Sequence, residues 1–596
     1  MATAKMPTLS FRGQTSAIVE FAFGELRSYL GRTPALHNLK EIQLAVEPGE
    51  RDAFEFRAEK SSLTLVGATE RSCLYAVYAL LENCGWRFPV PGEERFESQS
   101  FRAASWRNLQ GKTEASFAFR GLSVLSNSAD ELAAVVDWMG KQRLNSIFPG
   151  HKGDNARWKE LLPDLERRGI RVEVGGHILD EFLPLELFSQ RPELFRIKDG
   201  QRREDGNFCT SNPETLRIVT ENAMKFVREA PAAQVFHFWA EDVTGGSWCQ
   251  CDQCKAFSPA EQMLRAINAI ADALAQERPS AVVDLILYHD TLEFPESLQP
   301  RSNVWAFYCP RERCYAHGLG DANCPHNAWY ASRLNAAKNS FGARLSVFEY
   351  YCDLVLWRCL GITVPATIVN DLPWYKSLGV DQVQALHFGQ FSNWAYALNA
   401  FAFARASWDV QLKRDALVTQ FCHARYGEHA RLMLQAYFSF EQASLQALTF
   451  DGYGKDCYDI RDLPAQPAEF AQKHIASIEQ AVGQIETALA KLPDTGHRAI
   501  QGERLLLELT RDNLRSLVHQ LRGLQFEQAS TEPDRAAKMN AEYDAAIALL
   551  KDLQKRMTEA PRQTTGAWGA EGAPGQFQQI AELLQSAKDG KRHRNW

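Results

Sequence analysis

The feature that most constrains the fold of this chain is a series of short apolar runs between residues 117 and 395, several of them separated by helical stretches such as ELAAVVDWMGKQR. Eight buried strands with helical connections are what a (β/α)8 barrel requires. A doubly wound open sheet is the alternative, but no GxGxxG motif opens any of these helices. The runs are FAFRGLSV, LNSIFPG, IRVEVGG, QVFHFWAED, AVVDLILYHD, SNVWAFYC, RLSVFEYY and DQVQALHFG.

Different patterns flank this series on both sides. Residues 1–110 combine strand-like segments such as LKEIQLAV with the amphipathic stretch RSCLYAVYALLENCG, which is typical of a small α/β domain. Residues 401–596 have the three-to-four apolar spacing of helices almost throughout. We therefore predict an α/β protein with three domains: an N-terminal α/β domain (1–110), a TIM-like (β/α)8 barrel (111–400) and an α-helical C-terminal domain (401–596).

Charge and hydropathy exclude some classes of partner. The chain has 66 Lys and Arg against 73 Asp and Glu, a net charge of −7, so no basic surface for nucleic acid is expected. No run of about 18 apolar residues is present, so we expect no membrane span. The first thirty residues lack the pattern of a signal peptide, which leaves a cytoplasmic protein or a trimmed secreted or periplasmic one as alternatives. The oligomeric state stays open.

Polar and aromatic side chains gather where the apolar runs stop. The active sites of (β/α)8 barrels lie at the C-terminal ends of the strands, so these side chains would line one pocket of sugar size. Aromatics make up 11% of the chain, and flat rings can stack on sugars. Buried core histidines and aromatics are the structural alternative for each of them. The predicted substrate-binding residues are Arg120, His151, His177, Trp239, His289, Asp290, Tyr350, His387 and Trp394.

Three carboxylates stand out at predicted strand ends. Glu241 and Asp242 follow QVFHFWA, the fourth run, and Glu349 follows RLSVF in the seventh. Cleavage of a glycosidic bond needs two acidic groups, one to protonate the leaving oxygen and one to attack or stabilise the oxocarbenium-like centre. We predict Glu241 as general acid/base, Glu349 as nucleophile or stabiliser, and Asp242 as a residue that orients the substrate. Surface acid pairs or a structural salt bridge are the alternatives.

Cysteines are concentrated just after the acid pair. Cys249, Cys251 and Cys254, together with Cys209, could form a tetrahedral four-thiolate site for a structural zinc ion. Reduced packing thiols or a disulfide are the alternatives. No His-x-x-x-His spacing accompanies these cysteines, so we expect no catalytic metal and no cofactor required for catalysis. A second group, in RERCYAHGLGDANCPHN, fits no standard zinc finger and predicts an ordered loop near the pocket.

Several of these segments resemble known families. GATERSCLYAVYALLENCGWRFPVPG is similar to the domain that precedes the barrel in glycoside hydrolase family 20 hexosaminidases and bacterial α-glucuronidases. FRGLSV, KQRLNSIF, VEVGGH and FHFWAEDV resemble the first four strands of the family 20 barrel, in order. CTSNPE, CQCDQC, CYAHGLGDANCPHN and VFEYY resemble the domain of unknown function 4838 group, part of which is classified as glycoside hydrolase family 163. The resemblance spans roughly residues 20–440.

The resemblance implies a retaining glycosidase, and within family 163 an endo-acting β-N-acetylglucosaminidase that cleaves N-glycan cores. Family 20 enzymes carry Asp-Glu after strand four, with the Glu as acid and the Asp positioning the substrate acetamido group. This chain has Glu241-Asp242, the reverse order. A direct carry-over would make Asp242 the acid and Glu241 the polarising residue.

The predicted function is therefore a retaining glycoside hydrolase that acts on a β-linked N-acetylglucosamine-type or related bond in oligosaccharides or N-glycans. Three alternatives remain open. They are a carbohydrate-binding barrel without catalysis, a metal-dependent enzyme that uses the cysteine and histidine groups, and a non-hydrolytic sugar-active enzyme on the same barrel.

Overall fold

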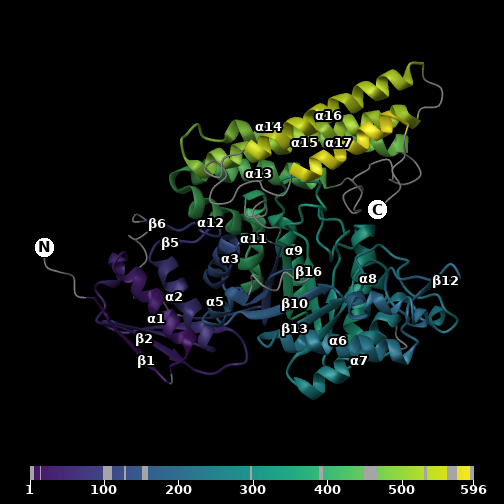
Figure 1. Ribbon diagram of the computed structural model, residues 1–596. Coiled ribbons are helices and arrows are strands. Elements are labelled where there is room, and N and C mark those ends of the chain that lie inside the picture. The colour runs from purple at the N-terminus through teal and green to yellow at the C-terminus, as the bar shows by residue number, and fades with distance from the viewer. Residues whose placement is uncertain are drawn as a thin grey trace.

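The computed structural model describes residues 6–13, 15–97, 111–125, 129–150, 159–294, 298–387, 394–448, 467–528, 533–559 and 574–590. Figure 1 shows three parts: a small N-terminal α/β part in purple, a barrel in blue and teal, and a layer of long helices in green and yellow above them. Among the described residues, no helix combines the length and apolarity that a membrane span requires.

The N-terminal part is a mixed sheet covered by two helices. Its strands lie in the order β1-β2-β4-β3-β7, parallel from β1 to β4 and antiparallel at β3 and β7. The side chains of Ser16 and Thr69 cap the first turns of the helices. The elements are β1 (Thr8–Arg12), α1 (Ala17–Leu30), β2 (Glu41–Val46), β3 (Ala53–Ala58), β4 (Ser62–Gly67), α2 (Glu70–Asn83) and β7 (Gly111–Glu114), with the small hairpin β5 (Trp86–Arg87) and β6 (Arg95–Phe96).

The central part is a closed barrel of parallel strands, as the sequence predicts. Each strand pairs with the next one along the ring, and β17 pairs with β8, so the open-sheet alternative is wrong. The strands are β8 (Phe119–Val124), β9 (Ser146–Phe148), β10 (Arg171–His177), β13 (Ala233–Trp239), β14 (Val282–Leu287), β15 (Val304–Tyr308), β16 (Leu345–Glu349) and β17 (Gln382–His387). The helices between them are α3 (Ala129–Lys141), α5 (Leu162–Glu166), α6 (Pro213–Glu229), α7 (Pro259–Glu277), α8 (Pro325–Phe341) and α9 (Pro365–Ser377).

A buried charged network fixes which side chains point into the barrel. Glu173 on β10 accepts a hydrogen bond from Gln384 on β17, a strand that is not its neighbour, so both side chains cross the interior. His237 on β13 lies 3.0 Å from Glu173 Oε2 through Nε2 and 2.6 Å from Asp284 Oδ2 through Nδ1. Burial alone would lower the pKa of His237, but the two carboxylates outweigh it and raise this pKa to about 9. A protonated imidazole can donate to both partners.

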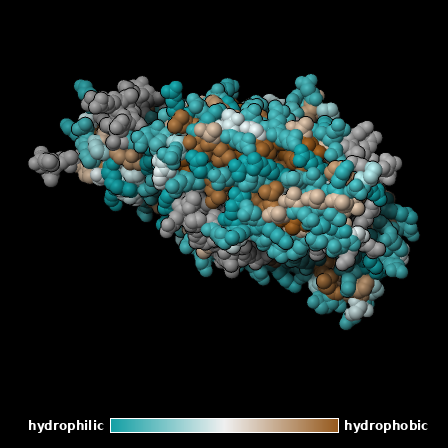
Figure 2. Space-filling model, turned by 90° about the horizontal axis from the view of Figure 1, so that it is seen from above, coloured by the Kyte–Doolittle hydropathy of each residue, from teal (hydrophilic) through white to brown (hydrophobic). Residues whose placement is uncertain are grey.

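The C-terminal part consists of helices that each pack on the next along the chain. Seen from above, Figure 2 shows a mostly hydrophilic surface on which hydrophobic side chains gather in separate patches. The helices are α11 (Ala397–Trp408), α12 (Arg414–Tyr426), α13 (Ala430–Ala447), α14 (Pro467–Lys491), α15 (Arg498–Gln528), α16 (Arg535–Glu559) and α17 (Pro574–Lys588).

Helix α15 lies against the segment that follows β16. Asn513 Nδ2 donates to the Arg358 carbonyl at 2.9 Å, and Arg358 donates to Gln520 Oε1 at 3.0 Å. Arg358 and Cys359 have φ angles of 52° and 59°, a left-handed conformation that residues other than glycine rarely adopt. Contacts with the helix therefore hold the segment that follows the seventh barrel strand.

Candidate active site

The acid pair lies just beyond the end of β13, at the carboxyl end of the barrel. Glu241 is partly buried, and its backbone N–H donates to Asn207 Oδ1 at 3.2 Å. The Asp242 side chain is 56% exposed, and its Oδ1 lies 3.7 Å from His177 Nε2 at the end of β10. The structure thus brings Asp242 and His177 together, with Glu241 beside them in the chain.

Trp239, the last residue of β13, is buried inside the barrel next to His177. Its indole N–H donates to Asp284 Oδ1 at 3.0 Å, and its ring is stacked on Phe307 of β15. The His177 ring packs on the Trp239 edge with 5.2 Å between ring centroids, and its Nδ1 donates to the Ala240 carbonyl at 2.5 Å. Because Nδ1 is engaged in this way, Nε2 is the nitrogen that faces Asp242.

The residues that follow β14 and β15 lie at the same end of the barrel. We call the loops after β13, β14 and β15 the rim. His289 follows β14, and its Nδ1 lies 3.7 Å from Glu312 Oε2 in the segment after β15. Burial raises the pKa of Asp290 to about 6. A Cβ on Gly245, in the loop that begins with the acid pair, would lie 3.6 Å from Asp290 Oδ2. The loops after three consecutive strands therefore approach one another.

Sequence reasoning missed Glu312 as a site candidate. Its side chain is 14% exposed, and its Oε1 lies 3.6 Å from Arg311 Nη1. Arg311 also donates to Asp353 Oδ2 at 2.8 Å and lies 5.8 Å from the ring centroid of Tyr350. The sequence did contain a signal for Glu312, because this residue lies in PRER, directly after the strand SNVWAFYC. An acid after the sixth strand lies at the same end of a barrel as an acid after the fourth.

The interior carboxylates were also missed. Glu173 and Asp284 stand in the middle of the runs IRVEVGG and AVVDLILYHD, where a charge among apolar residues is unusual. Asp284 accepts a hydrogen bond from the Trp239 indole, so this network holds the Trp239 side chain in place.

The structure places Glu349, the predicted second catalytic carboxylate, away from the strand-end loops. Successive side chains of a strand alternate, and Phe348, stacked on Phe307, points into the barrel. Glu349 therefore points outward, where it accepts a hydrogen bond from Tyr375 of α9 and lies 3.2 Å from Arg313. Burial raises its pKa to about 7. Glu349 is 1% exposed and does not face the strand-end rim.

Arg120 is also not placed for substrate binding. It is the second residue of β8, near the amino end of the strand, and it is fully buried. Its guanidinium donates to Asp52 Oδ2 of the N-terminal sheet at 2.9 Å and lies 5.2 Å from the ring centroid of Trp408. Burial would raise the pKa of Asp52, but Arg120 and Arg71 lower it to about 2. Arg120 thus joins the barrel to the N-terminal part of the chain.

The remaining predicted residues near the eighth strand are not brought to the rim. His387 is 1% exposed at the outward register of β17, two residues after Ala385, which pairs with Glu349. Trp394 is 1% exposed, and its indole N–H donates to the Gly502 carbonyl of α15 at 3.2 Å, so it packs against the C-terminal helices. Tyr350, by contrast, packs on Phe348 inside the barrel. His151 lies outside the described residues.

Cysteines gather beside the site in what we call the cysteine cluster. Its four sulfur atoms come from the segment before α6 and from the loop between β13 and α7, and all lie within 4.8 Å of one another. The members are Cys209, Cys249, Cys251 and Cys254.

The fold and the rim define a (β/α)8 barrel protein with acidic, histidine and aromatic side chains at the carboxyl ends of its strands. Residues 104–439 match the family described as Domain of unknown function (DUF4838), and the chain belongs to this family. The match includes the whole barrel and the first helices that follow it. The sequence has no match among curated proteins.

Solved structures share the fold at low sequence identity. A GH138 enzyme described as targeting pectin rhamnogalacturonan II matches 99% of this chain and 81% of its own, with a TM-score of 0.64 and 10% identity. A family GH115 4-O-methyl-α-glucuronidase, described as having specificity for decorated arabinogalactans, matches 94% of this chain and 78% of its own, with a TM-score of 0.57 and 13% identity. At such identities the likeness establishes the architecture alone.

Proposed function

We propose that this protein is a glycoside hydrolase whose active site is the rim formed by the loops after β13, β14 and β15. The observation that carries the proposal is the set of partly buried carboxylates, Glu241, Asp290 and Glu312, which follow three consecutive strands at the carboxyl end of the barrel. Paired acids next to aromatic rings are what cleavage of a sugar acetal requires.

In the proposed mechanism Glu241 protonates the leaving glycosidic oxygen, and Glu312 attacks the anomeric carbon or stabilises its developing positive charge. Glu312 takes the role that the sequence analysis gave to Glu349, whose side chain contacts Tyr375 of α9 and Arg313. In the second step water attacks the anomeric carbon, Glu312 leaves as a free carboxylate, and Glu241, now a carboxylate, accepts the proton of the water. His177 and Asp242 lie against each other and orient sugar hydroxyls.

The proposed bond is a β-linked N-acetylglucosaminide or a related linkage in oligosaccharides or N-glycans, cleaved with retention. The resemblance of the strand motifs to family 20 and family 163 supports this choice. The reversed Glu241-Asp242 order is the point at which the chain departs from family 20, so the position of the acetamido group relative to Asp242 is the feature to test.

The two structural neighbours widen the choice of substrates to test and leave the bond open. One is described as targeting the pectin rhamnogalacturonan II and the other as a 4-O-methyl-α-glucuronidase with specificity for decorated arabinogalactans. A screen for this protein should therefore include uronic acid and deoxysugar glycosides beside N-acetylglucosaminides.

The first experiment is a screen of the purified protein against chromogenic glycosides and intact N-glycans, with released sugar detected by mass spectrometry. Glu241→Gln and Glu312→Gln should each abolish release while circular dichroism stays unchanged. Glu221→Gln, which changes an exposed glutamate on α6, is the matched control and should retain activity. Release that persists in both rim variants would overturn the assignment.

A carbohydrate-binding barrel without catalysis is the second candidate, and the reversed acid order favours it. Binding of an oligosaccharide, measured by calorimetry, with no cleavage of any substrate in the screen would support this candidate. Where cleavage does occur, proton NMR of the first-formed anomer tests whether the configuration is retained.

A further inference from the structure

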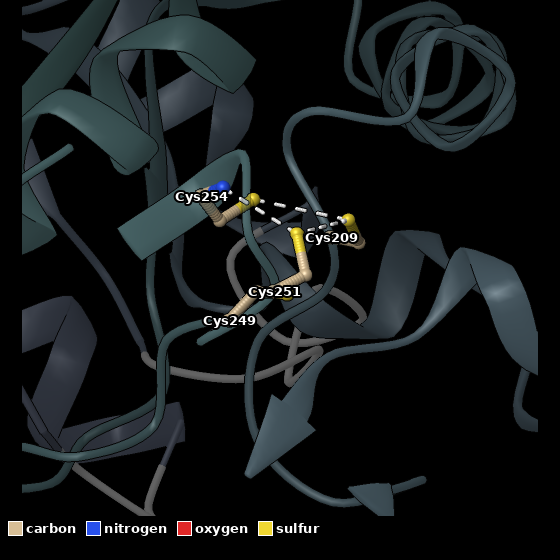
Figure 3. Close-up of side chains that lie close together, drawn as sticks. All are labelled: Cys209, Cys249, Cys251 and Cys254. Carbon is tan, nitrogen blue, oxygen red and sulfur yellow. Dashed lines mark hydrogen bonds between the residues drawn. The ribbon is translucent and has the colours of Figure 1, made fainter. Parts of the chain in front are cut away.

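The sulfur positions of the cysteine cluster have the geometry of a metal centre. Cys209 Sγ lies 3.7 Å from Cys251 Sγ and 3.8 Å from Cys254 Sγ. In a tetrahedral zinc site with Zn–S bonds of about 2.3 Å, neighbouring sulfur atoms are about 3.8 Å apart. A disulfide would need about 2.05 Å. Figure 3 shows the sulfur atoms of Cys209, Cys251 and Cys254 pointing toward one another.

The backbone around the cluster supplies the donors that thiolates need. Ile197 N–H donates to Cys249 Sγ at 3.3 Å, and Cys254 N–H donates to Cys251 Sγ at 3.4 Å. Such donors stabilise negative charge on sulfur. The buried Gln262 of α7 donates through Nε2 to the carbonyls of Cys249 and Cys254, at 3.2 Å each, which fixes the turn that carries three of the four sulfurs.

The surroundings explain why a metal would be needed there. Cys209, Cys249 and Cys254 form a small buried cluster that is separate from the main hydrophobic core, and among the described residues the partly buried hydrophobic side chains packed against it are Ile197 and Cys251. So few apolar contacts give little stabilisation to loops of this length. Each of the three cysteines is at most 3% exposed, which leaves no open coordination position for a substrate.

We propose that the cysteine cluster binds one zinc ion as a closed, structural four-thiolate site. On binding, the four thiols lose their protons to solvent and four Zn–S bonds form, with no change of oxidation state. The ion ties the segment before α6 to the loop between β13 and α7. Asn207, two residues before Cys209, accepts from the Glu241 backbone and pairs with Ser247, so the same ion fixes the segment on which Glu241 rests.

Metal content of the full-length protein tests the proposal independently of any glycosidase activity. Protein purified under reducing conditions without chelator should contain one zinc per chain by elemental analysis. Replacement of zinc by cobalt should give the intense visible d–d bands of a tetrahedral cobalt thiolate. Protein without metal that also fails to bind cobalt after full reduction would overturn the proposal, as would two disulfides within the cluster by mass spectrometry.

Variants assign the ion to this cluster. Cys209→Ala should lose the zinc, and the rate of tryptic cleavage after the exposed Lys255 should increase several-fold. Cys84→Ala, which changes a buried cysteine of the N-terminal part, is the control and should keep the zinc. If Cys209→Ala fails to fold, Cys251→His serves as a second variant. It keeps a metal ligand at the partly exposed position, so it should retain the zinc. Zinc that remains in Cys209→Ala but disappears in Cys314→Ala would place the ion at the second cysteine and histidine group and overturn the proposal.

Discussion

Two sectors of the same barrel use carboxylates in opposite ways. In the sector of β13 to β15, Glu241, Asp290 and Glu312 lie beyond the strand ends and are partly buried. In the sector of β16 and β17, Glu349 is the last residue of its strand but points outward. There it forms an ion pair with Arg313 and accepts a hydrogen bond from Tyr375. The difference teaches that the position of an acid along a barrel strand is not enough to predict its role, because the face on which it lies decides between chemistry and packing.

Contact with the C-terminal helices is a second difference between the two sectors. Helix α15 contacts the segment after β16 through Arg358 and accepts a hydrogen bond from Trp394, which follows β17. The side chains of the β16–β17 sector therefore contact helices. The side chains that follow β13 and β14 contact the loops that follow other strands. We expect the rim after β13 to β15 to govern turnover and the β16–β17 sector to govern stability.

The largest contrast should come from matched glutamate variants of the two sectors. Glu312→Gln should lower kcat/KM by about 10²–10⁴-fold, because the reaction loses one of its two acidic groups. Glu349→Gln should leave kcat/KM close to that of the wild type, because this side chain faces α9. Steady-state kinetics on the substrate identified by the screen measure both. Equal losses in the two variants would show that the sectors do not differ in the way proposed.

Removing the cation of the β16 sector should cost stability. Arg313→Met leaves the buried Glu349 and Asp371 carboxylates without their guanidinium partner, so we expect a loss of about 3–5 kcal/mol in the free energy of unfolding. Urea unfolding followed by fluorescence measures the loss. Arg217→Met on the exposed face of α6 is the control, and it should cost no more than about 1 kcal/mol. A stable Arg313→Met protein would contradict the structural role of this sector.

The rim should show its own pH dependence of stability through Asp290. Its pKa is raised to about 6, so the folded protein holds this proton more tightly than the unfolded chain does. The resulting stability is full below the ordinary aspartate pKa and is lost as the pH rises through about 6. Asp290→Asn should therefore be more stable than the wild type above pH 6, by about 1–2 kcal/mol after solvent screening, and no more stable near pH 4. Thermal unfolding across this range checks the sign, and a constant difference would contradict it.

The smallest effect is expected at Trp394. Trp394→Phe keeps a ring in the core and removes the hydrogen bond to the Gly502 carbonyl, at a cost of about 1 kcal/mol in stability. The KM for the substrate should not change, because the indole packs against α15 and does not face the rim. A clear rise in KM, measured beside the unfolding curve, would return Trp394 to the substrate site.

Much of the architecture could be predicted from local pattern. The eight apolar runs all became barrel strands, and the three-to-four spacing beyond residue 400 became helices, because both periods follow directly from backbone geometry. The acid pair after β13 and the proximity of the four cysteines were also predictable, since each depends on spacing close to one strand end. The partners of Arg120 and Trp394, which are Asp52 and Gly502, were not predictable, because each lies far away in the sequence.

The sequence by itself determined the elements of this protein, their order and the end of the barrel at which polar residues gather. Only the tertiary structure decided which face each side chain occupies. Strand β16 reads LSVFE and is buried on both faces, inside against Phe307 and outside against α9, so its sequence lacks the apolar–polar alternation that would mark Glu349 as outward. Where both sides of a strand are covered, the direction of a side chain follows from strand register and packing around the whole ring, which no local pattern encodes.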